Sequence, residues 1–348
     1  AFLILFLFLN TFSAKAQSLN ERIDAIESKV IEWRRDLHQN PELSNREFET
    51  AKKVAAHLNH LGLEVRQGIA YTGVVGILYG GKPGPVVALR ADMDALPVVE
   101  RTDVPFASTV KSTYLGQEVG VMHACGHDTH VAMLMGAAEV LSGMKDQIQG
   151  TIVFIFQPAE EGAPPGEEGG AKLMIKEGVL NDPAVEVIFG LHISSTLPVG
   201  KLRYKPGGAM AAADRLTIKV KGKQTHGSRP WMGVDPIIVS AEIMMGLQLI
   251  IARQTDLTKE AAVISIGKIQ GGVRNNIIPE EVEMIGTIRT LDTEMQEKLH
   301  ADIRRTATKI AESFGAEAVV DIEIGYPVTF NDLDLTREML PTLFRVAG

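Results

Sequence analysis

Three apolar stretches restrict the fold of this chain more than any other feature. Residues 86–89, 151–156 and 185–192 are strand-like stretches that consist mostly of apolar side chains. A strand without polar alternation is buried on both faces, as in a parallel sheet that is covered by helices. Segments with helical spacing separate these stretches, among them residues 131–144. Such strands alternating with helices predict an α/β domain with a mostly parallel sheet.

A different pattern follows in the second half of the chain. Residues 214–221 alternate polar and apolar side chains, which indicates a strand with one wet face. Further helices and strands are predicted at residues 235–253, 262–269, 282–289, 293–314 and 317–324. Their order, β-α-β-β-α-β, is that of a ferredoxin-like α+β domain. This part of the chain therefore predicts a second, smaller domain.

The change of pattern suggests where the domains begin and end. The length of 348 residues already favours two domains over one. We expect residues 17–207 to form the first part of the larger domain and residues 208–325 to be inserted into it. Residues 326–348 would begin the return to the larger domain. Because these residues are too few to complete it, we expect its last part beyond Gly348.

The N-terminal residues have the pattern of a targeting segment. Residues 2–9 form an apolar run that is too short to span a bilayer. Ala14 and Ala16 then provide the small residues of a signal-peptidase site. We predict a signal peptide over residues 1–16, export to a periplasm or the extracellular space, and no stable membrane span after cleavage. A membrane anchor and a frayed apolar tail are the alternatives.

Charge and cysteine content limit the partners of the chain. The formal net charge is −8 and there is no basic run, which argues against nucleic acid because phosphate binding needs clustered Lys and Arg. The single cysteine, Cys125, cannot form an internal disulfide. In an exported protein a lone thiol is open to oxidation, and metal ligation is one reason to keep it.

The start of the second predicted helix also has a recognisable pattern. Ser44 is followed three residues later by Glu47, the spacing of a capping box. Gly62 follows the last apolar residue of this helix, where a glycine commonly ends a helix. We therefore expect Ser44 and Glu47 to bind the first backbone N–H groups of a helix that ends near Leu61.

Residues 121–130 concentrate side chains that bind metals. They contain three of the nine histidines, His123, His127 and His130, together with Cys125. Imidazole and thiolate at this density indicate a metal site. A single Cys-x-His pair is weak support by itself, so the conclusion depends on other donors nearby.

Those other donors follow the predicted strands. Asp92 and Asp94 come after the first strand, Glu160 and Glu161 after the second, and His192 ends the third. The carboxyl ends of parallel strands meet at one edge of a sheet, where α/β proteins place their sites. Taken singly, the Glu pair could be a solvated surface pair and His192 a core histidine. Their coincidence at successive strand ends predicts one metal site.

The donor types indicate the chemistry of that site. Sulfur, nitrogen and oxygen donors together suit zinc or manganese, with cobalt and nickel as alternatives. One carboxylate of the Glu160–Glu161 pair could bind the metal while the other takes a proton from an activated water. The rival hypothesis makes Cys125 a nucleophile with His127 as its base. It leaves Glu160, Glu161 and His192 without a role.

Five motifs in one order carry a family resemblance. They are residues 33–42 (WRRDLHQNPE), 90–97 (RADMDALP), 122–130 (MHACGHDTH), 157–162 (QPAEEG) and 225–230 (THGSRP). The chain resembles the metal-dependent amidohydrolases that include hippurate hydrolase, N-acyl-amino-acid amidohydrolases and the plant hydrolases of indole-acetyl-amino-acid conjugates. These belong to the aminoacylase and carboxypeptidase superfamily. The resemblance covers nearly the whole chain after residue 16.

The resemblance implies roles for the residues of the predicted site. Four side chains would hold the divalent metal, with two ions per site: Cys125, His127, Glu161 and His192. Glu160 would be the general base, and Asp94 a supporting catalytic acid. Asp92 stands where many members of the superfamily have a ligand histidine. His123 and His130 would have supporting or packing roles.

The inserted domain would complete the enzyme as a lid and dimerisation domain. The resemblance implies that His226, Asn276 and Arg289 bind a small N-acyl amino acid or peptide, and that the protein is a homodimer through this domain. For Arg289, an arginine on the surface of a strand is the alternative. Relatives have one more histidine ligand near their C-terminus. Here only His300 follows His226, on a helix of the inserted domain, so that ligand is expected beyond Gly348, with a weakly held second metal as the alternative. The alternative function is a binding protein without catalysis, for which Glu160 would be unnecessary.

Overall fold

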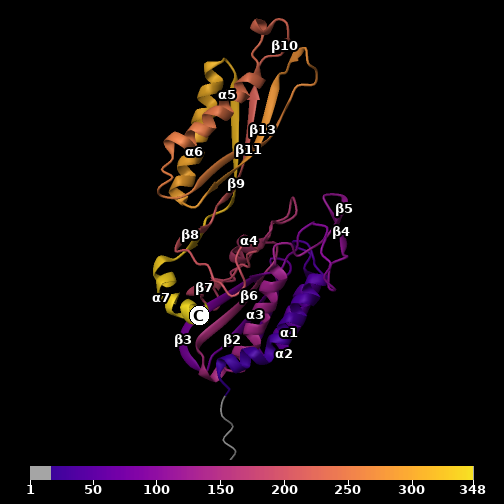
Figure 1. Cartoon of the computed structure of the whole chain (residues 1–348), viewed down its shortest axis with the longest axis vertical. Helices are drawn as coiled ribbons and strands as arrows, with labels where there is room; N and C mark the ends of the chain where they lie inside the picture. The colour runs from indigo at the N-terminus through magenta and orange to yellow at the C-terminus, as the bar shows by residue number, and fades with distance from the viewer. Residues whose placement is uncertain (1–16, 348) are drawn as a thin grey trace, which may run out of the picture. The chain divides into compact units, whose positions relative to one another are not determined.

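The computed structural model describes residues 17–347, and the chain divides into two compact units, residues 1–195 and 196–348 (Figure 1). The predicted signal peptide lies outside the described residues. The unit boundary at 195/196 is close to the predicted boundary at 207/208, and the exact domain limits stay predictions. Each unit has its own sheet and its own hydrophobic core.

The first unit is built on a five-stranded sheet with the order β1-β2-β6-β3-β7. Its strands are β1 (Glu64–Ile69), β2 (Gly73–Tyr79), β3 (Lys82–Asp92), β6 (Gln149–Gln157) and β7 (Val187–Gly190). β3 is parallel to β6 and β7, whereas β2 is antiparallel to β1 and β6. The sheet is therefore mixed rather than mostly parallel. Only two residues join β2 to β3, so these strands run in opposite directions, and β6 between them can be parallel to only one.

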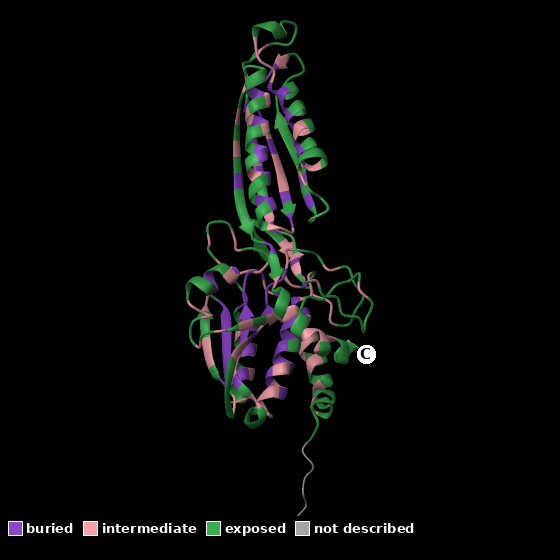
Figure 2. Cartoon of the chain, turned by 90° about the vertical axis from the view of Figure 1, so that its left-hand side faces the viewer, coloured by how far each residue is buried: buried purple, intermediate pink, exposed green. Residues whose placement is uncertain are grey.

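Helices cover both faces of this sheet, as the apolar strands predict. α1 (Leu19–Gln39), α2 (Phe48–His60) and α3 (His127–Ser142) pack on one face, and α4 (Gly170–Lys176) packs on the other. Within β6, Phe154 and Phe156 face the three helices while Val153 and Ile155 face α4. Figure 2 shows the resulting buried strands between partly exposed helices. This explains why β6 carries no polar alternation.

The predicted capping box at the start of α2 is wrong. The Ser44 hydroxyl donates to Asp94 Oδ2 at 2.6 Å, and Glu47 is fully buried below the helix start. The carboxylate of Glu42 accepts from the backbone N–H groups of Glu49 and Thr50 instead, at 3.1 and 2.8 Å. Glu42, five residues before Glu47, thus binds the free N–H groups of the first helical turn, and Ser44 and Glu47 are available for other contacts.

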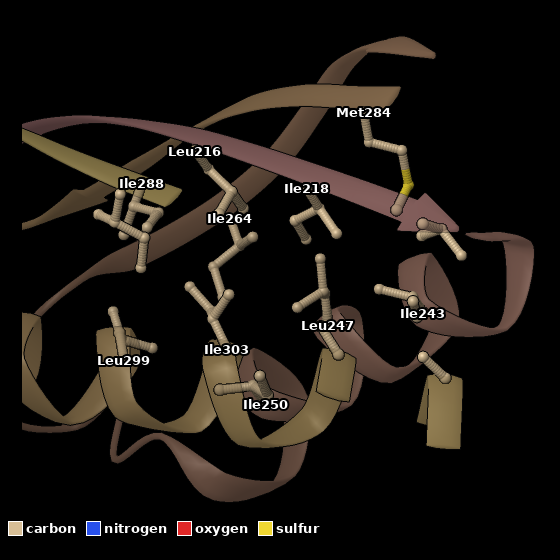
Figure 3. Packing of buried hydrophobic residues seen from close by; sticks show 14 of the residues in the cluster. Leu216, Ile218, Ile243, Leu247, Ile250, Ile264, Met284, Ile288, Leu299 and Ile303 are labelled. Atoms are coloured by element: carbon tan, nitrogen blue, oxygen red, sulfur yellow. The ribbon is translucent and has the colours of Figure 1, made fainter. Parts of the chain in front are cut away.

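The second unit has the β-α-β-β-α-β order. Its elements are β9 (Ala213–Lys221), α5 (Pro236–Leu249), β11 (Ala262–Gly271), β13 (Glu281–Thr290), α6 (Thr293–Ser313) and β14 (Glu317–Tyr326). The sheet order is β11-β13-β9-β14 with every pairing antiparallel, which is the ferredoxin-like topology. Figure 3 shows the core between this sheet and its two helices. Leu216 and Ile218 of β9 meet Ile243 of α5 and Ile303 of α6 there.

Shorter elements complete the two units. In the first unit β4 (Lys111–Tyr114) and β5 (Gln117–Gly120) form a hairpin. In the second unit β8 (Gly207–Met210) pairs with β15 (Thr329–Asn331), and β10 (Thr225–His226) pairs with β12 (Ile277–Ile278). The last helix is α7 (Leu333–Ala347). The described residues also contain three short helical segments that are not α-helical: Lys145–Gln147, Pro230–Met232 and Ile250–Gln254.

One helical stretch within residues 17–347 is long and apolar enough to cross a membrane by length and composition alone. It is Pro236–Gln254, with a mean hydropathy of 1.5 over the window, of which 33% is buried. The core helix of a soluble protein passes the same test. Val239, Ile243 and Leu247 on this helix lie in the core of the second unit, so this stretch is weak support for a membrane span.

Candidate metal centre

Three groups of potential metal ligands lie at the carboxyl end of the first sheet, and all include His127. They are Cys125, His127 and His192; Asp92, His127 and His130; and His127, Glu160 and Glu161, with ligand atoms within 4.8 Å of one another in each group. β3 ends at Asp92, β6 ends just before the Glu pair, and α3 begins at His127. The parallel pairing of β3 and β6 brings these ends together, as expected at this edge of an α/β sheet.

His127 is the centre of the site and is fully buried. Its Nδ1 donates to the backbone carbonyl of Asp94 at 2.8 Å, which leaves Nε2 as the lone-pair nitrogen of the neutral ring. Nε2 is buried without a hydrogen-bond partner in the described part of the chain. It faces Glu160 Oε2 at 3.7 Å and Glu161 Oε1 at 3.9 Å. A buried nitrogen without a partner is costly, and a divalent cation between it and the carboxylates would satisfy all of them.

The charge around His127 also fits a cation. Burial by itself lowers the pKa of His127. The neighbouring Asp94 and Cys125 side chains and the charges of Asp92 and Asp94 outweigh burial and raise this pKa to about 11. The carboxylates therefore attract a positive charge to this position, either a proton on the ring or a metal ion that replaces it.

The sulfur and the second imidazole lie on a more exposed side of the site. Cys125 Sγ is 3.5 Å from His192 Nε2, and His192 Nδ1 donates to the carbonyl of Ile193 at 2.5 Å. The neighbouring imidazoles of His127 and His192 lower the pKa of Cys125, which favours the thiolate that metals bind. The bond to Cys125 raises the pKa of His192 to about 9.

A buried carboxylate aims the Glu pair at this centre. The backbone N–H groups of Glu160 and Glu161 donate to Asp94 Oδ1 and Oδ2, each at 3.0 Å. Burial by itself raises the pKa of Asp94. Hydrogen bonds from His127 and Ser44 outweigh burial and hold the pKa below its ordinary value, so the carboxylate keeps its charge. Asp94 therefore supports the site through the backbone of the Glu pair, and its own side chain is buried.

Glu160 has the properties of a base. Its side chain is 36% exposed, and none of the hydrogen bonds of the described residues involves its carboxylate, although Oε2 is 3.7 Å from His127 Nε2. Burial and then the charge of Asp92 raise the pKa of Glu160. A carboxylate with a raised pKa binds a proton more readily, which suits proton transfer near neutral pH.

Asp92 and His130 form a supporting pair. His130 Nδ1 donates to Asp92 Oδ1 at 2.6 Å, while His130 Nε2 accepts from Ile193 N at 2.9 Å. Arg90 Nη1 holds the other Asp92 oxygen at 2.5 Å. Because both nitrogens of His130 are engaged, this histidine supports the loop of His192 rather than facing the centre. His123 is buried, and neither of its nitrogens has a hydrogen-bond partner among the described residues.

The predicted substrate residues of the second unit fall into two places. His226 on β10 pairs with Ile277 on β12, and Gly227 N donates to the carbonyl of Asn276 at 2.8 Å, so His226 and Asn276 are close together. His226 Nδ1 accepts from Ser228 N at 3.1 Å, which leaves the hydrogen on Nε2. Arg289 lies elsewhere, near the C-terminal end of β13. At ~3.3 Å per residue it is roughly 26 Å from Glu281, the first residue of that strand.

Sequence reasoning missed three side chains that support this centre: Ser44, Glu47 and Arg90. Ser44 and Glu47 had a sufficient local explanation as a helix cap, which hid their role. Arg90 precedes Asp92 by two residues on β3, so both side chains lie on the same face of the strand. That spacing was a usable signal.

His300 Nε2 lies 2.7 Å from Asp214 Oδ2 within the second unit, in agreement with a structural role.

Comparison with known proteins assigns the family. Residues 88–346, about three quarters of the chain, match the model of peptidase family M20/M25/M40. The chain belongs to this family.

Relatives of this M20/M25/M40 chain cover most of its length. It is 46% identical over 333 residues to thermostable carboxypeptidase 2 of Saccharolobus solfataricus, which covers 95% of the chain and 81% of that protein. It is 39% identical to the N-acyl-L-amino acid amidohydrolase of Geobacillus stearothermophilus, over 90% of the chain and 81% of that protein. The crystal structure of Bacillus subtilis YXEP protein, a dinuclear metal-binding peptidase of the M20 family, matches with a TM-score of 0.78 and 38% identity. The match covers 93% of this chain and 80% of the YXEP chain.

These findings confirm the resemblance and the mixed α/β fold. The chain is a metal-dependent hydrolase that acts on C–N bonds. The relatives named here are a carboxypeptidase, an amidohydrolase and a metal-binding peptidase, so they give no support to a binding protein without catalysis. They also give none to Cys125 as a nucleophile, since the M20 neighbour is described by its two metals.

Proposed function

We propose that this hydrolase cleaves the amide bond of N-acyl amino acids or small peptides, with Glu160 as the general base. The observation that carries the proposal is the Glu160 carboxylate, 3.7 Å from the buried Nε2 of His127 and next to the ligand candidate Glu161. Its pKa is raised by burial and by Asp92. The names of the carboxypeptidase and amidohydrolase relatives indicate the same class of substrate.

We infer that four side chains hold the divalent metal: Cys125, His127, Glu161 and His192. The dinuclear neighbour supports two ions per site, as Zn²⁺ or Mn²⁺ with Co²⁺ and Ni²⁺ as alternatives. Bound there, the metal would polarise the substrate carbonyl and lower the pKa of a water to about 7. The buried, unpaired Nε2 of His127 and the lowered pKa of Cys125 both favour metal binding.

The protein's own groups then have defined tasks. Glu160 takes a proton from the attacking water and delivers it to the leaving amine. Asp94 holds the backbone of Glu160 and Glu161 in place. His226 carries its hydrogen on Nε2 and would donate it to the oxyanion of the substrate, and Asn276 beside it would bind the substrate carboxylate. Arg289 lies near the far end of β13 from these two residues, so its role in substrate binding stays a prediction.

The remaining predictions about the whole protein belong to this proposal. Residues 208–325 would serve as an inserted lid and dimerisation domain, with the protein a homodimer. The compact second unit with its own core supports an independent domain there. We also propose export to a periplasm or the extracellular space, which depends on the signal pattern of residues 1–16.

A substrate panel with and without chelator tests the function. We expect metal-loaded protein to hydrolyse at least one N-acetyl, N-benzoyl or dipeptide substrate, and a chelator to abolish the activity. Glu160→Gln should lower kcat by about 10³-fold, within the range of general-base catalysis. Glu168→Gln is the matched control, because Glu168 lies eight residues later and is paired with Lys176 on the surface.

Three outcomes would contradict the proposal. Turnover that a chelator does not reduce would remove the metal from the reaction. Full activity in Glu160→Gln would remove the proposed base. Tight substrate binding without any product, in metal-loaded wild type, would favour the binding-protein alternative.

A further inference from the structure

Glu47 is a buried carboxylate that the proposed reaction does not use. Its side chain is fully buried in the first unit. None of the ion pairs in residues 17–347 includes it, and the charge of nearby Asp94 acts against its ionisation. A buried acid without a cationic partner is costly, so its contacts indicate what it does.

The contacts of Glu47 are hydrogen bonds from three donors. Oε1 accepts from the backbone N–H of Asn45 at 3.1 Å and from that of Ala159 at 2.9 Å. Oε2 accepts from the hydroxyl of Thr72 at 2.5 Å. Of these, the bond to Ala159 spans 112 residues of sequence and reaches the residue directly before Glu160.

Ala159 has an uncommon backbone conformation. It is fully buried, and its φ of 47° lies in the left-handed region that residues with a Cβ rarely adopt. The three successive N–H groups of residues 159–161 all point to buried carboxylates: Ala159 to Glu47, then Glu160 and Glu161 to Asp94. Successive N–H groups that converge on one acceptor site form a nest, and here the acceptors are carboxyl groups of the protein.

We propose that Glu47 is a positioning residue that holds the left-handed turn at Ala159 and thereby fixes where the Glu160 and Glu161 side chains point. This inference rests on the proposed function for the roles of Glu160 and Glu161. Asp94 holds the second and third N–H groups of the turn, and Glu47 holds the first. Without Glu47 the buried Ala159 N–H loses its acceptor, and the turn is free to relax to an ordinary conformation.

Two substitutions at Glu47 separate this role from general stability. Glu47→Gln keeps an amide oxygen that accepts from Ala159 N–H, and its NH₂ group can donate to Thr72. Glu47→Leu has a similar size and no acceptor. Glu42→Gln is the matched control, since Glu42 lies in the same segment and also binds two backbone N–H groups, those of Glu49 and Thr50 at the start of α2.

Kinetics and zinc binding report the position of the Glu pair. For Glu47→Leu we expect kcat to fall about 100-fold with KM nearly unchanged, the size of effect that a displacement of about 1 Å produces. Competition with a chromophoric chelator should show Zn²⁺ affinity lowered by about 10-fold, as for loss of other supporting contacts. Glu47→Gln and Glu42→Gln should both stay close to wild type in kcat and Zn²⁺ affinity, whatever the change in their Tm.

Hydrogen exchange of the 157–162 peptide is the readout that does not depend on activity. It should be faster in Glu47→Leu than in wild type, Glu47→Gln or Glu42→Gln. If Glu47→Leu does not fold, Thr72→Val replaces it, because it frees one oxygen of Glu47 and should change exchange and kcat in the same direction by less.

The inference is overturned if folded Glu47→Leu has wild-type kcat and exchange, or if Glu47→Gln is as impaired as Glu47→Leu. A wild type that shows no metal-dependent hydrolysis would instead contradict the proposed function. In that case exchange and Zn²⁺ affinity still decide whether Glu47 holds the turn.

Discussion

The two sides of the metal centre differ in how firmly the fold holds their side chains. On the inner side His127, Asp92 and Asp94 are 0–1% exposed, and each is bonded to backbone or to other buried groups. On the outer side His192 is exposed and Cys125 half-buried. Within residues 17–347 the His192 ring is hydrogen-bonded only to Cys125 and to its neighbour Ile193. We therefore expect the inner side to keep its geometry without metal, and the outer side to depend on the metal.

Removing one imidazole from each side tests this difference with the largest expected effect. His127→Asn should lower Zn²⁺ affinity by at least about 100-fold, because loss of a mere supporting contact already costs 10- to 100-fold. His127 belongs to all three ligand groups, and His192 to one. His192→Asn should therefore lose less affinity, with Zn²⁺ competition as the measurement and circular dichroism to check folding. Equal losses in the two variants would contradict the comparison.

Asp94→Asn tests the inner support without removing a ligand. The asparagine side chain keeps one acceptor oxygen. Its NH₂ group cannot accept from the N–H or O–H donors that now bind Asp94, so at least one of those donors loses its partner. We expect Zn²⁺ affinity and kcat to fall by 10- to 100-fold.

A buried aspartate of the second unit provides the control for Asp94. Asp214 is 2% exposed and accepts from Gln296 and Gly325. Asp214→Asn should lower Tm and leave Zn²⁺ affinity unchanged. A loss of Zn²⁺ affinity in Asp214→Asn, or none in Asp94→Asn, would show that stability and not support of the ligands decides the effect.

The sequence was sufficient for the parts of the fold that depend on periodic patterns. Runs such as residues 151–156 predicted a buried strand because both faces of β6 are covered. The sheet directions were not predictable to the same extent. β1 was missed since Glu64, Gln67 and Gly68 interrupt its apolar pattern, and β1 is an edge strand with little burial.

The ligand candidates were recognisable, while the contacts that support them were not. Cys125, His127 and the Glu pair have chemistry that stands out in a sequence. Glu47 and Ser44 contact residues that are 112 and 50 positions away. Local spacing explained both as a helix cap, and only the tertiary structure shows that Glu42 has that task. Long-range hydrogen bonds to backbone leave no periodic pattern in the sequence.

His130→Gln addresses the weakly held outer side. His130 links the inner side to the outer one, since it donates to Asp92 and accepts from Ile193 N beside His192. A glutamine cannot make both bonds with the same geometry, so the His192 loop should loosen. We expect Zn²⁺ affinity to fall by about 10-fold, less than for Asp94→Asn. An unchanged affinity would mean that the metal alone positions His192.

The smallest effect concerns the stability of the inner side rather than its activity. Burial raises the pKa of Glu47 to about 7 from an ordinary value of 4.5. The folded protein therefore binds a proton more tightly at Glu47 than the unfolded chain does. That contribution to stability is present at low pH and is lost as the pH rises through about 7. Glu47→Gln has no such titration.

The Tm of Glu47→Gln relative to wild type should therefore depend on pH. In metal-free protein the difference should be small at about pH 5 and should grow in favour of the variant by about pH 9. Its limit is about 3 kcal/mol, or several degrees in Tm. The measurement is thermal unfolding of both proteins with chelator present, since bound metal would shift Tm by itself. A constant difference across this range would mean that Glu47 keeps one protonation state, and that the inner side tolerates a buried charge there without a cost.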